Sequence, residues 1–390
     1  MTARRALLAS LPVGAAGAAA ALLQEQQTAP TIRSAPGTDW PVPQQFGAVG
    51  DGRADDTAAL TAWLEAGQRR NARLAAGTYR ITRSLVARIG EDGQGLNIIG
   101  DGAANTAIIM DGPVSDPVLQ VIGNMPDFDQ LRISGFRLER PDRGMSGFGR
   151  GAGLLLENVR QFAIDDLRTF RQGIGLHLIG CLVGQINNVL SYYDRQGMLL
   201  EQGSYLATPN VIAIDNCSIL ASLRIGIEIN AGTCISMRGT TFEGTGVEAP
   251  DKPATGLLVR RSGLAGGVAI DASALYFENN HGSDIVIDHP DRPLTYGFMR
   301  CVINRFAKSA LAPSIVFRSD AGVAGAPAIV DLSGSAFLGH GSDYKATARR
   351  PAVAFELPNG FTAVQLFDQS TLYQFPEERP NLTRFRAPAR

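Results

Sequence analysis

The sequence has almost no excess of charge of either sign. It contains 36 Lys and Arg residues and 37 Asp and Glu residues, which gives a formal net charge of -1. Such a chain has no global field that would attract nucleic acid or an anionic membrane surface. We therefore expect no nucleic-acid partner, and any electrostatic recognition must come from a local group of side chains.

Cysteine and histidine are scarce, with four residues of each. The cysteines show no CxxC spacing and stand in apolar stretches such as "GCLVG" and "DNCSIL", which is typical of buried free thiols. No cluster of histidines and cysteines has the spacing of a metal site. The sequence therefore predicts no metal site and no cofactor.

Long periodic helices are few, whereas 44 glycines and 21 prolines indicate a chain that turns often and favour β structure. The main apolar run, from Ala6 to Leu23, follows Arg4 and Arg5. This arrangement resembles a twin-arginine export signal, which implies a periplasmic or secreted protein. The run is short and diluted by glycine, so we expect no membrane span in the mature form. The alternative is an anchoring or trimerising helix of a virion protein.

Three aspartates precede an amphipathic stretch in "FGAVGDGRADDTAALTAWLEAG", residues 46–67. Glycines beside Asp51 indicate a turn, and Asp55 or Asp56 can accept hydrogen bonds from the first turn of a helix that begins after them. Leu60, Trp63 and Leu64 then fall on one helical face. We interpret the three aspartates as structural rather than catalytic.

This motif, followed by "RLAAGTYRI" at residues 73–81, resembles the N-terminal signature of the pectate-lyase superfamily. Its members are right-handed parallel β-helix proteins and include polygalacturonases and phage tailspikes. The resemblance implies an all-β solenoid whose first coil is capped by an N-terminal α-helix. We expect a signal-like or anchoring segment at 1–30, a linker at 31–45, the β-helix at 46–375 and a C-terminal tail at 376–390.

A repeat supports this architecture, because each coil of a solenoid buries its apolar side chains against its neighbours. Units that begin with "G-apolar" start at Gly151, Gly173, Gly197, Gly226 and Gly256, at intervals of 22, 24, 29 and 30 residues. Stacking these units places Asp166, Asn188 and Asn216 in one column near a turn. Such a column can satisfy the backbone groups of the turns.

Basic residues recur just before these glycines. Arg171, Arg195 and Arg224 stand two residues ahead of Gly173, Gly197 and Gly226. Guanidinium groups on three consecutive coils would form a positive row that pairs with the carboxylates of an acidic polysaccharide. The alternative is a solvated row paired with Asp194 and other acids.

Strand alternation assigns further residues to the outer surface. It sends Leu176, Leu178, Ile227 and Ile229 inward and His177 and Glu228 outward, with Glu201, Asn230 and Arg260 one step further along. The candidate acid/base residues are His177, Asp194, Glu201 and Glu228. The candidate substrate-binding residues are Arg171, Tyr193, Arg195, Arg224, Asn230 and Arg260. Each of these could instead be an ordinary surface or structural residue.

The active-site motifs of the family are incomplete here. Asp165 and Asp166 lie on a second strand, "GHG" at 339–341 has no partner motif, and no clear set of calcium-binding acids is present, so calcium is possible but unsupported. The sequence predicts a protein that binds, and cleaves by hydrolysis or β-elimination, an extended acidic polysaccharide. The alternative is a non-catalytic tailspike or adhesin that recognises a host glycan, as a homotrimer and virion component.

Overall fold

The computed structural model describes most of residues 40–374. The gaps within this range are 69–70, 90–94, 125–129, 145–147, 205–207, 250–252, 261–266, 290–292, 307–311, 319–327, 340–351 and 357–363. The described residues fall in one compact unit, Trp40–Arg390. The expected export-type segment at 1–30 and the tail at 376–390 lie outside the described residues.

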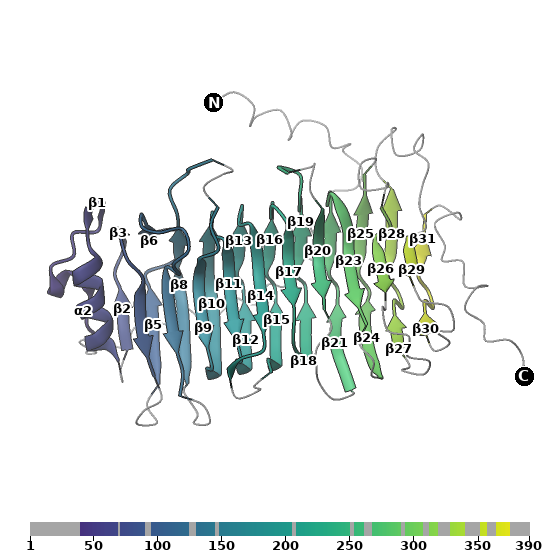
Figure 1. Ribbon diagram of the computed structural model, residues 1–390, viewed down its shortest axis with the longest axis horizontal. Coiled ribbons are helices and arrows are strands. Elements are labelled where there is room, and N and C mark those ends of the chain that lie inside the picture. Colours follow the sequence, from purple (N-terminus) through teal and green to yellow (C-terminus); the bar gives the residue numbers. More distant parts are fainter. Residues whose placement is uncertain are drawn as a thin grey trace, which may run out of the picture. The chain divides into compact units, whose positions relative to one another are not determined.

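The described residues form a right-handed parallel β-helix in which every strand pairing is parallel (Figure 1). One sheet contains ten strands: β4 (Leu85–Arg88), β7 (Leu119–Ile122), β9 (Ala152–Glu157), β11 (Ile174–Ile179), β14 (Gln196–Glu201), β17 (Ile225–Ile229), β20 (Ala254–Val259), β23 (Gly282–Asp288), β26 (Ile315–Arg318) and β29 (Val353–Glu356). We refer to it as the ten-stranded sheet.

The other sheet has 21 strands and covers the remaining sides of each coil. Its strands are β1 (Asp51–Asp55), β2 (Asn71–Leu74), β3 (Gly77–Ile81), β5 (Leu96–Gly100), β6 (Thr106–Met110), β8 (Leu131–Glu139), β10 (Arg160–Phe170), β12 (Leu182–Asn187), β13 (Leu190–Tyr192), β15 (Asn210–Asp215), β16 (Ser218–Leu220), β18 (Thr233–Arg238), β19 (Thr241–Glu243), β21 (Gly267–Ser273), β22 (Tyr276–Glu278), β24 (Leu294–Met299), β25 (Val302–Arg305), β27 (Ala328–Asp331), β28 (Ala336–Gly339), β30 (Val364–Phe367) and β31 (Leu372–Tyr373).

The core is the interior of the coils. Leu176, Leu178, Ile227 and Ile229 point inward, with exposed fractions of at most 2%, as their alternation predicts. Each inward side chain packs on its counterpart one coil away, for example Leu176 on Met198, which pairs with it in the neighbouring strand. The hydrophobic core is therefore continuous along the stack.

A column of left-handed residues separates the long strands from the short strands of the 21-stranded sheet. Asp166, Asn188 and Asn216 occupy this column at φ of 46°, 52° and 53°. Their neighbours in the sheet pair directly, as in Asp165 with Asn187 and Asn187 with Asp215. Asn and Asp tolerate this conformation better than most residues. The predicted polar column is therefore present, and it sets the bend between the two strands of each coil.

A second column consists of glycines whose missing side chains allow the coils to approach one another. A Cβ at Gly175, Gly197 or Gly226 would lie 2.4–2.5 Å from the carbonyl oxygen of the next residue in the column. The start of the repeat expected at Gly173 lies two residues too early, because Gly175, and not Gly173, stacks on Gly197. The corresponding residue one coil earlier is Gly153.

Asp194 lies inside the coil next to this glycine column and is fully buried. Its carboxylate accepts hydrogen bonds from the Thr169 hydroxyl (2.5 Å), the Ser191 hydroxyl (2.7 Å) and the Gln172 amide (2.7 Å). Burial raises the pKa of Asp194 to about 7, because the cost of desolvating the charge outweighs these three hydrogen bonds. The placement of Asp194 as an outward acid/base group was therefore wrong.

The first coil is closed by the helix α2 (Thr57–Gly67), which follows a short 3-10 turn, η1 (Pro43–Phe46) (Figure 1). Leu60, Trp63 and Leu64 are at most 1% exposed and seal the end of the core. Within the part of the chain that is described, no helix combines the length and the apolar character needed to cross a bilayer.

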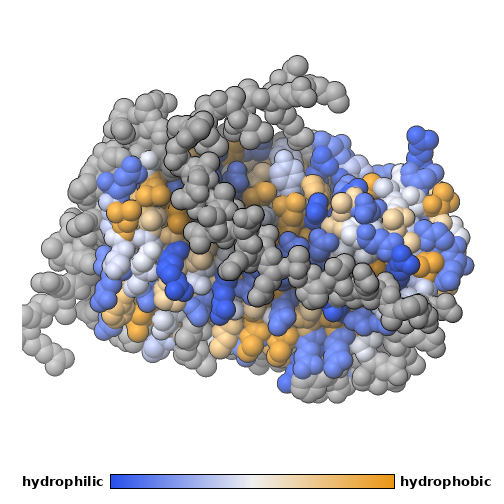
Figure 2. Space-filling model, turned by 180° about the vertical axis from the view of Figure 1, so that it is seen from behind, coloured by the Kyte–Doolittle hydropathy of each residue, from blue (hydrophilic) through white to orange (hydrophobic). Residues whose placement is uncertain are grey.

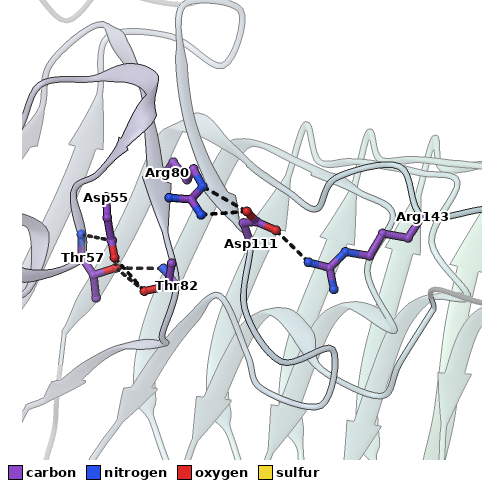
Figure 3. Close-up of polar contacts among 6 residues, drawn as sticks. All are labelled: Asp55, Thr57, Arg80, Thr82, Asp111 and Arg143. Carbon is purple, nitrogen blue, oxygen red and sulfur yellow. Dashed lines mark hydrogen bonds and ion pairs between the residues drawn. The ribbon is translucent and has the colours of Figure 1, made fainter.

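The three aspartates of the N-terminal motif shape the backbone. Asp51 accepts hydrogen bonds from the amides of Arg53 and Ala54. Asp56 directly precedes α2, but its side chain accepts from the amides of Val49 and Gly50 and does not cap the helix. Asp55 instead binds the amide and hydroxyl of Thr57 and the hydroxyl of Thr82 (Figure 3). The hydrogen bonds thus agree with a structural role for all three.

Near this motif, Asp111 forms ion pairs that link successive coils. Asp111 accepts from Arg80 at 2.9 Å and from Arg143 at 2.7 Å, so one carboxylate joins two arginines from different coils (Figure 3). The two guanidinium groups lower the pKa of Asp111. These arginines are occupied within the protein and are therefore separate from the free basic residues described below.

The glycine column predicts a steep cost for a single methyl group. We expect Gly226→Ala to lower the free energy of unfolding by about 2 kcal/mol or more, since its Cβ would lie 2.4 Å from the Gly256 carbonyl oxygen. Gly297→Ala is the matched control, because the nearest atom to its Cβ would be 3.6 Å away. Urea unfolding measures both. Equal stability of the two variants would contradict the steric role of the column.

The buried carboxyl of Asp194 predicts a pH dependence of stability. Its native pKa, about 7, lies above the unfolded value, so its contribution is full below about pH 4 and is lost as the pH rises through 7. Between pH 5 and pH 8 we expect the wild-type free energy of unfolding to fall on the order of 2 kcal/mol more than that of Asp194→Asn. Exposed Asp271→Asn is the control and should behave as wild type. Parallel pH profiles for wild type and Asp194→Asn would refute this assignment.

Candidate functional site

The candidate site lies on the outer face of the ten-stranded sheet. Pairing between strands stacks His177, Leu199, Glu228 and Leu258 in one outward row. A second row contains Ile179 and Glu201, followed by Asn230 and Arg260 directly after the last paired residues of β17 and β20. A third row contains Ile174, Gln196, Ile225 and Thr255. Because coils repeat about every 4.8 Å, these rows present equivalent positions at that spacing.

His177, Glu201 and Asn230 come together as expected from their strand positions. The Nε2 atom of His177 lies 2.8 Å from Oε2 of Glu201, and the Nδ2 of Asn230 donates to Oε1 of the same carboxylate at 3.0 Å. Each carboxylate oxygen thus has one partner from a different strand. The Oδ1 atom of Asn230 is buried and has no hydrogen-bond partner among the described residues. Glu201 is therefore fixed in orientation by two neighbours.

Glu228 is the more enclosed of the two candidate carboxylates. Its side chain is 9% exposed, and its oxygens accept from Gln196 at 2.9 Å and pair with Arg260 at 2.5 Å. The Arg260 side chain is 51% exposed, so the ion pair is open to solvent on one side. A carboxylate held between an amide and a guanidinium on a rigid sheet has a defined position for interaction with a ligand.

A hollow of about 300 Å³ adjoins Glu228. Arg150, Arg195 and Arg224 line it together with Gly173, Ile174, Gln196 and Ile225. Arg195 and Arg224 stack on successive coils, and the amide of Arg224 donates to the Arg195 carbonyl at 3.0 Å. Gly173 precedes the pair Ile174–Gln196 and so occupies the Arg195 position one coil earlier, where it supplies no side chain. The hollow therefore lies where this column lacks a side chain, between basic groups.

Two of these three guanidinium groups, those of Arg150 and Arg195, have no partner among the described residues. The third, that of Arg224, donates to the Pro253 carbonyl at 3.3 Å. Arg150 and Arg195 are exposed and have neither a hydrogen bond nor an ion pair from their side chains to any residue that the structure describes. Arginines that face a hollow without an internal acid remain available for an anionic ligand.

Arg171, the third arginine of the expected row, does not lie where the sequence predicts. Arg171 does not stack on Arg195, because it lies at the turn equivalent to Tyr193, following the pair Phe170–Tyr192. Arg171 is 3.8 Å from Asp142, and the ring of Tyr193 packs on Phe148 with centroids 5.8 Å apart. These two residues and buried Asp194 therefore stand apart from the hollow.

The sequence reasoning missed two residues that the structure brings to the hollow, Arg150 and Gln196. Arg150 lies one residue before Gly151, the residue in register with Gly173, so it lines the hollow from beside the column of Arg195 and Arg224. The register of the repeat does not reveal Arg150, because Gly151 holds the position of Arg195 on that coil. Gln196 immediately precedes Gly197 and could have been found from its place at the start of a strand.

No metal site is evident in the described ranges of the chain, where no group of three or more His, Cys, Asp or Glu side chains is arranged to hold an ion. In the view of Figure 2, hydrophobic and hydrophilic residues are intermixed over the visible described surface. The outward rows show the same mixture, since leucines flank Glu228 on both sides. This site therefore combines apolar contact area with a few charged groups.

Comparison with solved structures identifies proteins of the same fold. The enzymatically active domain of bacteriophage CBA120 tailspike protein 2 is 13% identical, with a TM-score of 0.61 over 85% of this chain and 47% of that one. The A-module of the Azotobacter vinelandii mannuronan C-5 epimerase AlgE4 is 18% identical, with a TM-score of 0.52 over 85% and 95%. PfbA, a surface adhesin of Streptococcus pneumoniae, is 10% identical, with a TM-score of 0.55 over 86% and 93%.

Several matches are longer than this chain, which spans 60% of ORF18 of Geobacillus virus E2 and 54% of the Agl-KA catalytic domain. No curated protein matches the chain. A family described as rhamnogalacturonase A/epimerase, pectate lyase-like, matches residues 42–256, which is more than half of the sequence. The matched segment includes the capping helix, the left-handed column and all three arginines of the hollow. The chain therefore belongs to the rhamnogalacturonase A/epimerase, pectate lyase-like family.

Proposed function

We propose that the outer face of the ten-stranded sheet binds and cleaves an extended acidic polysaccharide. The observation that carries this proposal is the group of basic residues around the hollow beside Glu228, of which Arg150 and Arg195 have no partner among the described residues. Guanidinium groups bind carboxylates through two parallel hydrogen bonds. Their placement on successive coils suits a polymer that carries a charge on its repeating unit.

The shape of the face supports a polymer rather than a small ligand. The hollow is open, and the rows of Gln196, Glu228 and Asn230 continue past it at the spacing of the coils. A similar structure is named for mannuronan, an acidic polysaccharide, and another is an enzymatically active tailspike domain. These likenesses concern the fold, and the substrate class proposed for this chain depends on its own arginines.

For cleavage, we assign proton transfer to Glu228 and Glu201. Glycosidases use two carboxylates on either side of the scissile bond, one as acid and the other as base or nucleophile. Glu228 stands beside the hollow, while Glu201 on β14 shares a hydrogen with His177. Gln196, Arg260 and Asn230 orient the two carboxylates and bring donors close to the substrate. His177 is a positioning residue for Glu201 in this arrangement.

The second candidate function is recognition of a host glycan without cleavage. It is favoured by the observation that both carboxylates already have internal partners, an ion pair with Arg260 for Glu228 and two hydrogen bonds for Glu201. The likeness to a surface adhesin supports the same reading. Either function places the protein outside the cell or on a virion. Twin-arginine export and assembly into a homotrimer are parts of the proposal that remain predictions.

Removal of one free guanidinium should weaken binding in a salt-dependent way. We expect Arg195→Ala to reduce the affinity for polygalacturonate or alginate about tenfold at low ionic strength, and less as salt screens the interaction. Isothermal titration at two salt concentrations measures this effect. Arg238→Ala is the control, since it removes an equally exposed positive charge from the 21-stranded sheet. The same loss in both variants would show that net charge, and not the hollow, is responsible.

Cleavage by Glu228 should be separable from binding. Glu228→Gln keeps the side-chain shape and should retain affinity while lowering turnover at least about a hundredfold, as expected for loss of an acid or base. Turnover is measured by release of reducing ends and by the absorbance of unsaturated uronates. Full activity of the variant would remove Glu228 from the mechanism. A wild-type protein that binds these polymers but releases neither product would favour the second candidate function.

A further inference from the structure

A larger hollow lies on the other sheet, away from the proposed site. It has a volume of about 730 Å³ and is lined by residues of β2, β5, β8, β10, β12, β15 and β18, which are strands of seven successive turns of the 21-stranded sheet. At about 4.8 Å per coil these strands extend over roughly 30 Å. We call this hollow the amide groove. It crosses the strands and follows the direction in which the coils stack.

The floor of the amide groove is one outward row of the sheet. Successive strand pairings align Asn71, Asn97, Arg132, Ala163, Gln185, Ala213 and Ser236. Small side chains at Ala163, Ala213 and Ser236 keep the floor low, and the Gln185 amide stands between Ala163 and Ala213. The only charged side chain in the described lining is Arg132. The groove is therefore mixed in polarity and carries a single positive charge.

One wall of the groove consists of residues in the left-handed conformation. Gln130, Gln161, Val183, Val211 and Cys234 occupy equivalent positions at the strand starts, with φ between 49° and 64°. This conformation is strained for β-branched residues. Val183 and Val211 are nevertheless 42% and 53% exposed, so little packing within the chain offsets their strain. Strained, exposed valines along one ridge are typical of a surface that contacts a ligand.

The amide side chains of Asn97 and Asn71 are hydrogen-bonded to each other at 2.6 Å, whereas three glutamines in the described part of this groove are free. The side chains of Gln130, Gln161 and Gln185 have no hydrogen-bond partner among the residues that the structure describes. Each amide offers both a donor and an acceptor, which matches adjacent hydroxyl groups of a sugar. Backbone groups on the floor already pair between coils, so the groove offers no free sheet edge to which a peptide strand could add.

From these features we infer that the amide groove is a second glycan-binding site and that it takes a neutral, extended polysaccharide. The single charged side chain of its described lining distinguishes it from the arginine-lined hollow, which suits an acidic chain. This inference goes beyond the function proposed above and does not rest on it, because the two sites share no residue. The protein could then hold one polymer on this sheet while the ten-stranded sheet engages another.

Binding of neutral oligosaccharides tests this inference. Cellohexaose, xylohexaose, mannohexaose and maltohexaose serve as probes in isothermal titration with the full chain. We expect at least one to bind, and the double variant Gln161→Ala/Gln185→Ala to weaken it roughly tenfold, since two hydrogen bonds to hydroxyls are lost. Ala213→Met fills the floor without removing any polar group and should weaken the same probe to a similar extent. Thermal unfolding of each variant confirms that it is folded.

Two controls separate this site from the other face. Gln365→Ala removes an exposed amide from β30, outside the groove, and should leave the affinity unchanged. Arg195→Ala should also bind the neutral probe as wild type does, even if it loses acidic polysaccharide. Failure of all four probes to bind at millimolar concentration would overturn the inference. Unchanged affinity in the filled Ala213→Met variant, or loss of affinity in Arg195→Ala, would do so as well.

Discussion

Backbone hydrogen bonding between successive coils is the constraint on which the rest of this structure depends. Each strand is paired on both sides by the equivalent strand of the coils before and after it, so a residue keeps the same relative place for as long as the register is kept. Side chains far apart in sequence, such as His177 and Asn230, thereby meet around one carboxylate. Rigidity of the sheet gives these polar groups a fixed geometry without help from long loops.

The register itself is set by conformation at a few points in each coil. Asp166, Asn188 and Asn216 turn the chain in the left-handed region, and the glycine column around Gly197 lets two backbones come close. A side chain in the glycine column would disturb two coils at once, because each glycine contacts the backbone of the next coil directly. Buried Asp194 fills the space beside the glycines and satisfies a turn amide, which explains why a carboxyl is found at this place in a mainly apolar interior.

Much of the fold could be predicted from the sequence, since it is repeated. The Asp166–Asn188–Asn216 column, the inward leucines and the capping helix each have a local signal, and all are present. The alignment failed where the sequence offers two glycines, as in "GAG" and "GIG". A Cβ at either Gly173 or Gly175 would lie 2.5 Å from a carbonyl oxygen, so only the pairing of the strands distinguishes Gly175 as the residue that stacks on Gly197.

The candidate site was predictable in part for the same reason. Alternation along a strand gives the outward positions of Glu228 and Glu201, but it cannot assign turn residues such as Arg171 and Asp194 to the inside or the outside. Arg150 was missed because it lies one residue outside the column of Arg195 and Arg224 and reaches the hollow only in the folded stack. The sequence contains no motif that predicts the amide groove. Its lining residues, mostly glutamines, alanines and other common residues, form a groove only because seven strands align them.

The unequal lengths of the coils have a consequence for how such a protein can change. The glycine column advances by 22 residues from Gly175 to Gly197 but by 29 from Gly197 to Gly226. The extra residues are taken up in the turns, while the paired strands stay aligned. Insertions and deletions between strands can therefore reshape the rim of a binding face and leave its periodicity untouched. New binding specificities can arise from changes in the turns while the regular spacing of the outward side chains on the strands is kept.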